Sequence, residues 1–346
     1  MSAANTENWR GTREELKPYS DASWGKAVLD LATSVVPYLM LTALMFVLAL
    51  DLKINVLGIL GIGVLAAGFL LRTYIVFHDC AHNSFLPSRG GNTVLGTIVG
   101  LIVYSPFQAW RFDHSVHHAT AGDLDKRGVG DVETMTLNEY LEASPGRRAA
   151  YRAFRNPLVM FTIGPIFALL IMPRFVTAGM RPRNKRSILL TDVAVAGMIT
   201  AGCLIFGIPT FLLVWGPPLL LAGAAGVWLF YVQHQFEDTY WESGDRWSYG
   251  DAALRGSSYL KLRQPFQWFT GNIGLHHVHH LCHKIPNYNL QAAHDGTPVL
   301  HTVPVLSAWD GIKACRLKVW DEASGRLLTW GEVRALSAAQ PMAAGI

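Results

Sequence analysis

The sequence predicts an all-α membrane protein that crosses the bilayer with four helices. The first observation is a set of long stretches without any charged side chain, since runs of about 18 or more such residues are typical of membrane-crossing helices. The second is that histidines cluster at helical spacing next to these stretches. The stretches without charge lie at 31–50, 54–71, 92–110, 156–173 and 193–233.

Four of the predicted helices form two hairpins. The first helix fits about 31–50 and the second about 54–77, and the connector between them, "DLK", is short enough for a tight antiparallel pair. The third fits about 188–206 and the fourth about 210–234, with glycine and proline at the turn between them.

The two remaining apolar segments, 92–110 and 156–173, contain glycine and proline and are predicted to be interfacial or re-entrant. If neither crosses, all histidine-rich stretches lie on one side of the membrane. The loop 173–187 has five basic residues and no acid, which indicates that this side is the cytosol. Both chain termini are then cytosolic as well.

The chain therefore divides into three parts by prediction. A cytosolic N-terminal segment covers 1–30, the membrane domain covers 31–290, and a cytosolic helical cap with a tail covers 291–346. The net charge of +4 is small and the basic residues form no long tract, so a nucleic acid partner is not expected.

Three short motifs contain histidines spaced i, i+4 or i, i+3, i+4, which places them on one face of a helix. These motifs are "HDCAH", "HSVHH" and "HHVHH", and a further histidine ends the apolar run "FYVQH". A lone histidine is usually an ordinary hydrogen-bonded residue, but this repetition favours metal binding. The candidate ligands are His78, His82, His114, His117, His118, His234, His276, His279 and His280.

Nine imidazoles exceed what one metal ion needs, because one zinc takes three or four ligands. Neutral imidazole also binds iron, so the count favours two ions with open positions and points to iron and dioxygen chemistry. Nearby polar residues could orient the ligands, and Asn272 could hold a metal-bound water. These supporting candidates are Asp79, Asp113, Glu237, Asp238 and Asn272.

Four other histidines are not predicted to be ligands. His277 lies about 100° around a helix from His276, so we expect it to be solvated or to stand behind the ligands. His283 is i+3 from His280, but the helix is expected to end before Pro286, which makes a ligand role the less favoured alternative. His294 and His301 lie in polar, turn-rich sequence and are expected to be ordinary.

Taken together, the three motifs and the segment "WLFYVQHQFEDTYW" resemble the histidine boxes of the integral-membrane fatty acid desaturases, over about residues 70–290. The three residues between the histidines of the first box resemble the acyl-lipid omega-6 type. The third box begins with His276, where front-end desaturases typically have glutamine.

The resemblance implies an enzyme that inserts a cis double bond into a lipid-linked acyl chain, at an omega-6 or Δ12-like position, with dioxygen as co-substrate. It implies two iron ions held by the eight box histidines, with His234 matching the additional histidine of the family. No catalytic residue beyond the metal ligands is implied. No fused haem domain is recognisable, so a separate ferredoxin-like electron donor is expected, with the protein in a bacterial plasma (inner) membrane.

Other functions remain open from the residues alone. A hydroxylase, an acetylenase or a carotenoid-modifying oxygenase could use the same metal centre. A histidine-rich metal transporter is a rival from another class, although no histidine falls in 31–71 or 193–230, where a transport path would need one. A zinc protease is disfavoured because it would leave six histidines without a role.

Overall fold

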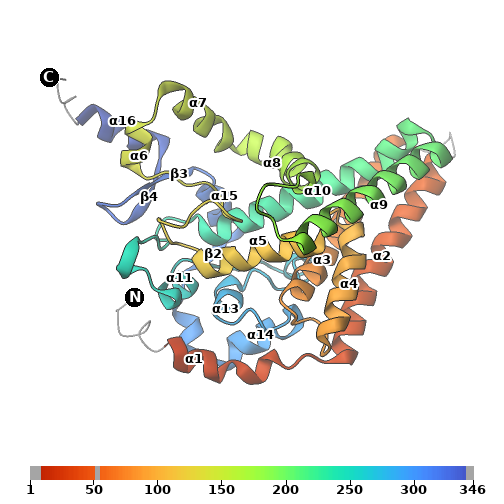
Figure 1. Ribbon diagram of the computed structural model, residues 1–346, viewed down its shortest axis with the longest axis horizontal. Helices are drawn as coiled ribbons and strands as arrows, with labels where there is room; N and C mark the ends of the chain where they lie inside the picture. The colour runs from red at the N-terminus through yellow and green to blue at the C-terminus, as the bar shows by residue number, and fades with distance from the viewer. Residues whose placement is uncertain (1–8, 51–54, 340–346) are drawn as a thin grey trace.

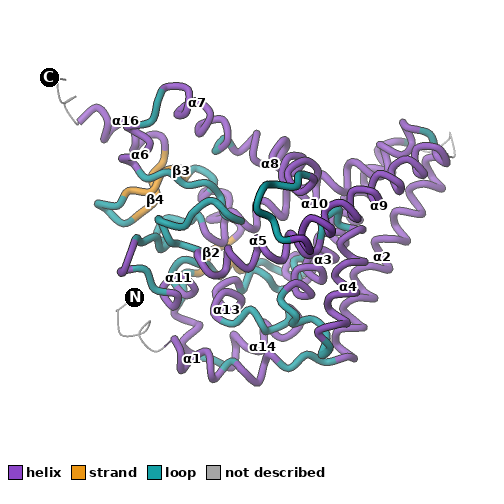
Figure 2. The backbone as a smooth tube through the Cα atoms, viewed as in Figure 1, coloured by secondary structure: helices purple, strands orange, loops and turns teal. Residues whose placement is uncertain are grey.

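The computed structural model describes residues 9–50 and 55–339. Helix dominates the described chain, with two small sheets at one end, as Figure 2 shows. The prediction of an essentially α-helical membrane protein is confirmed, and the two small sheets were not predicted from the sequence.

The four predicted spans are all present as long helices. Each is long and apolar enough to cross a membrane, and a helix of 27 residues extends about 40 Å against a hydrocarbon core of about 30 Å. They pack against one another and run together toward one end of the molecule in Figure 1. The predicted connector 51–53 lies outside the described residues. The four helices are α2 (Trp24–Leu50), α3 (Val56–Ala81), α9 (Pro182–Phe206) and α10 (Ile208–His234).

The outer faces of these helices are apolar and exposed. Leu57, Val193 and Leu204 are 71%, 74% and 82% exposed. Soluble proteins rarely expose continuous apolar surface of this kind, so lipid is the environment that these faces fit. α2 begins seven residues before its predicted start at residue 31, because Asp30 is buried in an ion pair with Arg72 of α3 and extends the helix beyond its apolar run.

Two further apolar segments are broken. The helices α4 (Arg89–Ile102) and α5 (Phe107–Thr120) meet at an angle of 103°, which suits a re-entrant or broken segment. The bend falls at "SP", where Pro106 disfavours helix at the residue before it. The second segment, Pro157–Arg174, is a fifth candidate span by length and composition. It consists of α8 (Pro157–Pro165), a π-helix (Ile166–Ile171) and a 3₁₀-helix (Met172–Arg174).

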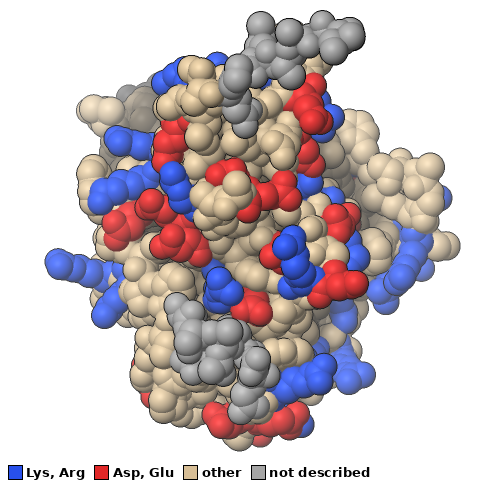
Figure 3. Space-filling view, turned by 90° about the vertical axis from the view of Figure 1, so that its left-hand side faces the viewer, with Lys and Arg blue, Asp and Glu red and all other residues tan. Residues whose placement is uncertain are grey.

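The remaining elements gather at the other end of the molecule (Figure 1). Its outer face carries acidic and basic side chains in mixture, which suits contact with water (Figure 3). The helices are α1 (Trp9–Glu15), α6 (Leu137–Glu142), α7 (Pro145–Phe154), α11 (Tyr249–Leu254), α12 (Phe266–Phe269), α13 (His276–Leu281), α14 (Asn287–Gly296), α15 (Ala308–Ala314) and α16 (Trp330–Ala339). Short 3₁₀-helices lie at Lys17–Ser20, Gly244–Arg246 and Pro298–Thr302.

Each small sheet has two strands. β1 (Tyr259–Lys261) pairs in parallel with β2 (Val305–Ser307), with Tyr259 opposite Val305. β3 (Leu317–Asp321) pairs antiparallel with β4 (Arg326–Thr329). β1 also bridges to Leu275, directly before α13, so this sheet braces the helix that carries the third histidine motif.

A buried arginine joins the end of α10 to the cap. Arg155, at the C-terminal end of α7, is fully buried and donates hydrogen bonds to five oxygen atoms. Two of these acceptors, Tyr231 and Gln235, lie at the end of α10, and a third is the carbonyl of Leu317 in β3. Burial of a charge is costly unless such bonds satisfy it, so Arg155 fixes the segment around His234 in place.

Candidate metal centre

The three histidine motifs lie on three helices that meet at the C-terminal ends of α3 and α10. His78 is in the last turn of α3 and His82 caps that helix. The second motif forms the C-terminal half of α5, and the third forms most of α13. His234 is the last residue of α10. The predicted helical spacing of these motifs is therefore present in the structure.

The histidines separate into two groups, in each of which one ligand atom per residue lies within 4.8 Å of all the others. All nine residues predicted from the sequence belong to one group or the other. The first group is His78, His82, His114, His118 and His279. The second group is His117, His234, His276 and His280.

Helix geometry explains why the motifs divide between the groups. On α5, His114 and His118 are i and i+4 and face the first group, whereas His117 faces the second. On α13 the order is reversed, since His276 and His280 are i and i+4 in the second group and His279 is in the first. Neither motif could have been assigned to one ion from the sequence.

The donor atoms fit metal ions. Pairs of Nε2 atoms lie 2.9 Å apart for His279 and His118, and 3.0 Å apart for His276 and His234. Nitrogens that share an ion at about 2.0–2.1 Å lie at about this separation from one another. The Nε2 atoms of His82, His117 and His280 are buried without a hydrogen-bond partner. Buried nitrogens that lack a partner are costly, and a bound cation would satisfy them.

Electrostatics also suits the role of neutral ligand. On α13, burial lowers the pKa of His276, His279 and His280 well below the usual histidine value, and the neighbouring histidines lower it further. The neutral imidazole is the form that binds metals.

Three ligand candidates are oriented through their Nδ1 atoms. His78 Nδ1 donates to the carboxylate of Asp79 at 3.0 Å, and His117 Nδ1 donates to that of Asp131 at 2.5 Å. His234 Nδ1 donates to the carbonyl of Gly256 at 3.0 Å. A hydrogen bond at Nδ1 fixes the tautomer in which Nε2 is free to bind a metal.

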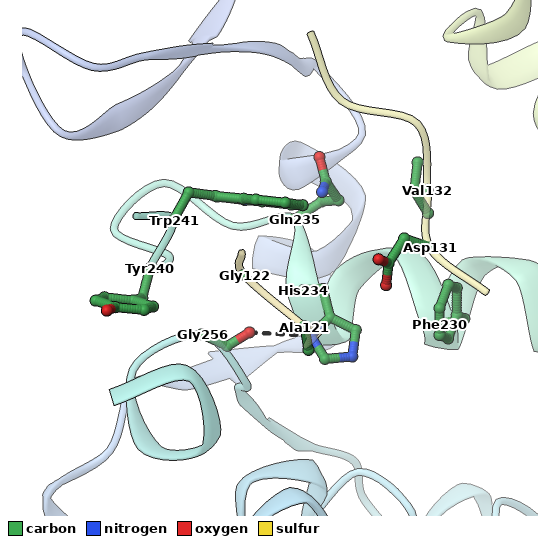
Figure 4. A pocket seen from close by; sticks show the side chains of 10 residues that line it. All are labelled: Ala121, Gly122, Asp131, Val132, Phe230, His234, Gln235, Tyr240, Trp241 and Gly256. Atoms are coloured by element: carbon green, nitrogen blue, oxygen red, sulfur yellow. Dashed lines mark hydrogen bonds between the residues drawn. The ribbon is translucent and has the colours of Figure 1, made fainter. Parts of the chain in front are cut away.

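Asp131 was not among the residues predicted from the sequence. The preceding residue, Gly130, has a φ of +72°, and a Cβ there would lie 3.1 Å from both the carbonyl oxygen of Asp113 and Cβ of His117. Glycine thus lets the loop approach α5 closely enough for Asp131 to reach His117. Asp131 and His234 also line a cavity of about 10 Å³, in which His234 points toward the Gly256 carbonyl (Figure 4). The glycine-rich "GVGD" was the only local signal for this contact.

A buried polar network stands behind His78. The second carboxylate oxygen of Asp79 accepts from the backbone and side-chain amides of Asn287 at 2.6 and 3.0 Å. The same Asn287 amide donates to Asp30 at 2.9 Å, and Asp30 is paired with Arg72. The network therefore joins α2, α3 and α14 to one ligand candidate, and Asn287 is a second residue that sequence reasoning missed.

Four of the predicted supporting residues have other surroundings. Asp113, Glu237 and Asp238 are exposed, and no hydrogen bond joins them to a candidate ligand among the described residues. Asn272 has a φ of +56° and donates from its side chain to the carbonyl of Asn287 at 3.2 Å. Of the five supporting candidates, Asp79 is the one that contacts a ligand candidate directly.

The remaining histidines lie outside both groups. His277 is fully buried, and its Nε2 lies 3.2 Å from Nδ1 of His294, so it stands behind the ligand face and is not solvated. His294 is in turn within hydrogen-bond distance of His301, through its carbonyl. His283 is half-buried with its ring 5.1 Å from that of His82, close to the first group but not part of it.

The fold and the site define a class of protein: a multi-span membrane protein with two buried, imidazole-rich groups that could each hold a metal ion at one end of its spans. The chain belongs to the fatty acid desaturase family. The model of that family, "Fatty acid desaturase", matches residues 55–302, which include all nine candidate ligands. The protein is thus an oxidoreductase, and family membership removes the transporter and the zinc protease as alternatives.

Individual relatives agree with this assignment. The chain is similar to a fatty acid desaturase of Bacillus subtilis, at 40% identity over 328 residues that cover 95% of this chain and 92% of that protein. It is similar to an sn-1 oleoyl-lipid 12-desaturase of Synechocystis sp., at 29% identity over 65% of this chain and 64% of that protein. It is also similar to a chloroplastic omega-6 fatty acid desaturase of Arabidopsis thaliana, at 26% identity over 64% of this chain and 49% of that protein.

Proposed function

We propose that this desaturase inserts a cis double bond into a lipid-linked acyl chain at an omega-6 or Δ12-like position. The observation that carries the proposal is the convergence of nine imidazoles on two groups at the inner ends of the spans. The position of the double bond is supported by the three-residue spacing of "HDCAH" and by the similarity to an oleoyl-lipid 12-desaturase. In the proposed reaction, two hydrogens leave adjacent methylenes, and dioxygen with two electrons and two protons is reduced to two waters.

Two iron ions, when bound, would supply the activation of dioxygen that an unactivated methylene requires. The residues proposed to hold them are the nine histidines of the two groups. The carboxylates of Asp79 and Asp131 and the carbonyl of Gly256 would keep three of these imidazoles in the ligand tautomer. Eight of the nine histidines are buried, which would keep bulk water from the reacting centre.

The four-span topology with a cytosolic centre is part of the proposal, and parity supports it. Residues of one buried group must lie on one side of the membrane. The first group contains His82 and His114, so the bent pair α4 and α5 between them does not cross. The second contains His117 and His234, so the intervening segments cross an even number of times. α9 and α10 account for two crossings, which leaves none for Pro157–Arg174.

The remaining elements of the proposal concern orientation, domains and partners. The basic loop 173–187 lies on the same side as the centre by this parity, which supports a cytosolic site in a bacterial plasma membrane. We keep the division into an N-terminal segment (1–30), a membrane domain (31–290) and a C-terminal cap (291–346). The electron donor is proposed to be a separate, ferredoxin-like protein.

Expression in a bacterial host whose lipids contain monoenoic but no dienoic fatty acids tests the function. Gas chromatography–mass spectrometry of the host lipids should reveal a new dienoic acid, and derivatisation should place its second double bond. The His279→Ala variant, matched for membrane expression, is the inactive control. Hydroxylated or acetylenic products would replace the proposal with the related oxygenase chemistry, and an unchanged lipid profile in the presence of donor and iron would refute both.

A further inference from the structure

A cavity of about 280 Å³ opens beside the first histidine group. This volume is close to the lower end of the range for small-ligand pockets, about 300 Å³. His82 and His114 form part of its wall, so whatever occupies the cavity lies next to the metal centre. The rest of the lining is Ala81, Asn83, Arg111, Phe112, Ser115, Arg181, Arg183, His283 and Lys284.

Four cations line this cavity and no acid does. Arg111 comes from α5, Arg181 and Arg183 from the start of α9, and Lys284 from the segment after α13. None of the four forms an ion pair with any acidic side chain in the part of the chain that the structure describes. Like charges gathered without counter-charges repel one another, and an anion in the cavity would relieve that repulsion.

Contacts with neighbouring residues position two of the four cations. Lys284 is held in place by a hydrogen bond to the carbonyl of His82. Arg181 lies over the ring of Phe112, with its Cζ 5.0 Å from the ring centroid. Lys284 and Arg181 are therefore positioned by contacts with the wall of the cavity.

Neutral polar groups of the lining add a second, independent observation. The side-chain oxygen of Asn83 is buried without a hydrogen-bond partner, and so is Nδ1 of His283. Buried polar atoms in proteins are normally satisfied, so both indicate a missing ligand. An amide side chain can also turn its donor group toward an anion.

The position of the cavity indicates where the anion comes from. It lies where α3 ends and α9 begins, which is the inner boundary of two membrane spans. Phosphate groups of membrane lipids occupy this level of a bilayer, and basic clusters at this level are typical sites for their recognition. An acidic protein would instead meet a flat or convex basic surface, because its carboxylates cannot all enter a cavity of this size.

We propose that this cavity binds a phosphate-type anion and that its natural occupant is the phosphodiester headgroup of an anionic lipid. Arginine is suited to this role because its planar guanidinium binds phosphate oxygens in pairs. A headgroup held against His82 and His114 keeps a lipid at the metal centre. That part of the inference rests on the proposed function, and anion binding itself does not.

Binding to the purified, iron-loaded protein in neutral detergent tests the proposal without turnover. The probes are dihexanoyl phosphatidylglycerol, inorganic phosphate, and dihexanoyl glycerol, which lacks the phosphate. We expect the first two to bind and compete, and the third not to bind. The double variant Arg111→Gln/Arg183→Gln should weaken phosphatidylglycerol binding about tenfold or more, since it removes two charge-assisted contacts. The matched control, Arg147→Gln/Arg316→Gln, changes two exposed arginines outside the cavity and should bind normally.

The arms of the experiment separate the outcomes. Arginine-dependent binding of inorganic phosphate without binding of phosphatidylglycerol supports the anion site and assigns it to free phosphate. Equal affinity of the wild type and both variants for every probe overturns the proposal. The proposal is also overturned if the double variant binds lipid normally but desaturates slowly with an acidic protein donor and at the normal rate with a chemical reductant. In that case the two arginines serve to bind the electron donor. An iron content and a melting temperature equal to those of the wild type exclude misfolding of a variant. If the protein does not desaturate lipids, the proposed function fails, but the measured anion binding still tests the cavity.

Discussion

Asp113 is close to the second histidine motif in sequence, whereas Asp131 is close to it in space. Replacing each aspartate by asparagine tests which of the two orients a histidine of this motif. Asp113 is next to His114 in sequence but is exposed, whereas Asp131 is 14 residues beyond His117 and contacts its Nδ1 at 2.5 Å. We expect Asp131→Asn to impair the enzyme and Asp113→Asn to leave it nearly unchanged. Asparagine preserves the shape of each side chain and removes its charge.

The magnitude follows from the contact. The Asp131 side chain is 7% exposed, so little solvent screens its bond to His117. Hydrogen bonds to charged groups contribute about 1.5–3 kcal/mol, which corresponds to a factor of about 10–150. Loss of a residue that orients a metal ligand typically costs about 10–100-fold in metal affinity or activity. We therefore predict a fall of about 10–100-fold in product formation for Asp131→Asn, with less iron bound per chain.

The assay measures dienoic product by gas chromatography–mass spectrometry and iron by elemental analysis, at matched membrane expression. The Asp113→Asn variant is the control, since it makes the same change at an exposed position of α5, the helix that carries His117. Equal activity of the two variants, or a larger loss in Asp113→Asn, would refute the assignment of Asp131 as the residue that orients His117.

Three further predictions follow from the fold and the site. Arg155→Met should lower stability by about 3 kcal/mol or more, measured as a lower melting temperature in detergent, because it leaves several buried oxygens without a donor; a melting temperature equal to the wild type contradicts this. His234→Ala should abolish product formation and reduce bound iron, and an active variant with full iron content would reduce the ligand set to eight. The topology can be tested with single cysteines at two exposed positions, Ala149 and Ile208, in a background with Cys203 replaced. An impermeant maleimide added outside intact cells should label the cysteine at position 208 and should not label the one at position 149. Strong labelling at position 149 would overturn the four-span topology.

Much of the architecture could be predicted because its signals are local. A run of uncharged residues determines a span without reference to the rest of the chain, and i, i+4 spacing places histidines on one helix face. The predicted starts of α2 and α9 were late by seven and six residues, because both helices continue into polar sequence. Asp30 within the first extension is buried only through its ion pair with Arg72, which is a tertiary contact.

The surroundings of the histidines could not be predicted in the same way. Closeness in sequence favoured Asp113, but a residue next to a ligand on a helix points about 100° away from it. Asp131 and Asn287 reach the centre from a loop and from a different helix, and their contacts depend on how the chain folds back. The division of the second and third motifs between the two groups also required the packing of α5 against α13.

Metal analysis of the purified full-length chain tests the central claim most directly. Protein from an iron-replete host, extracted in mild detergent and freed of loosely bound ions, should contain about two irons per chain, because two separate groups of imidazoles are present. The His279→Ala variant should contain less. A single zinc per chain, with no iron bound even after anaerobic reconstitution with ferrous iron, would contradict the account.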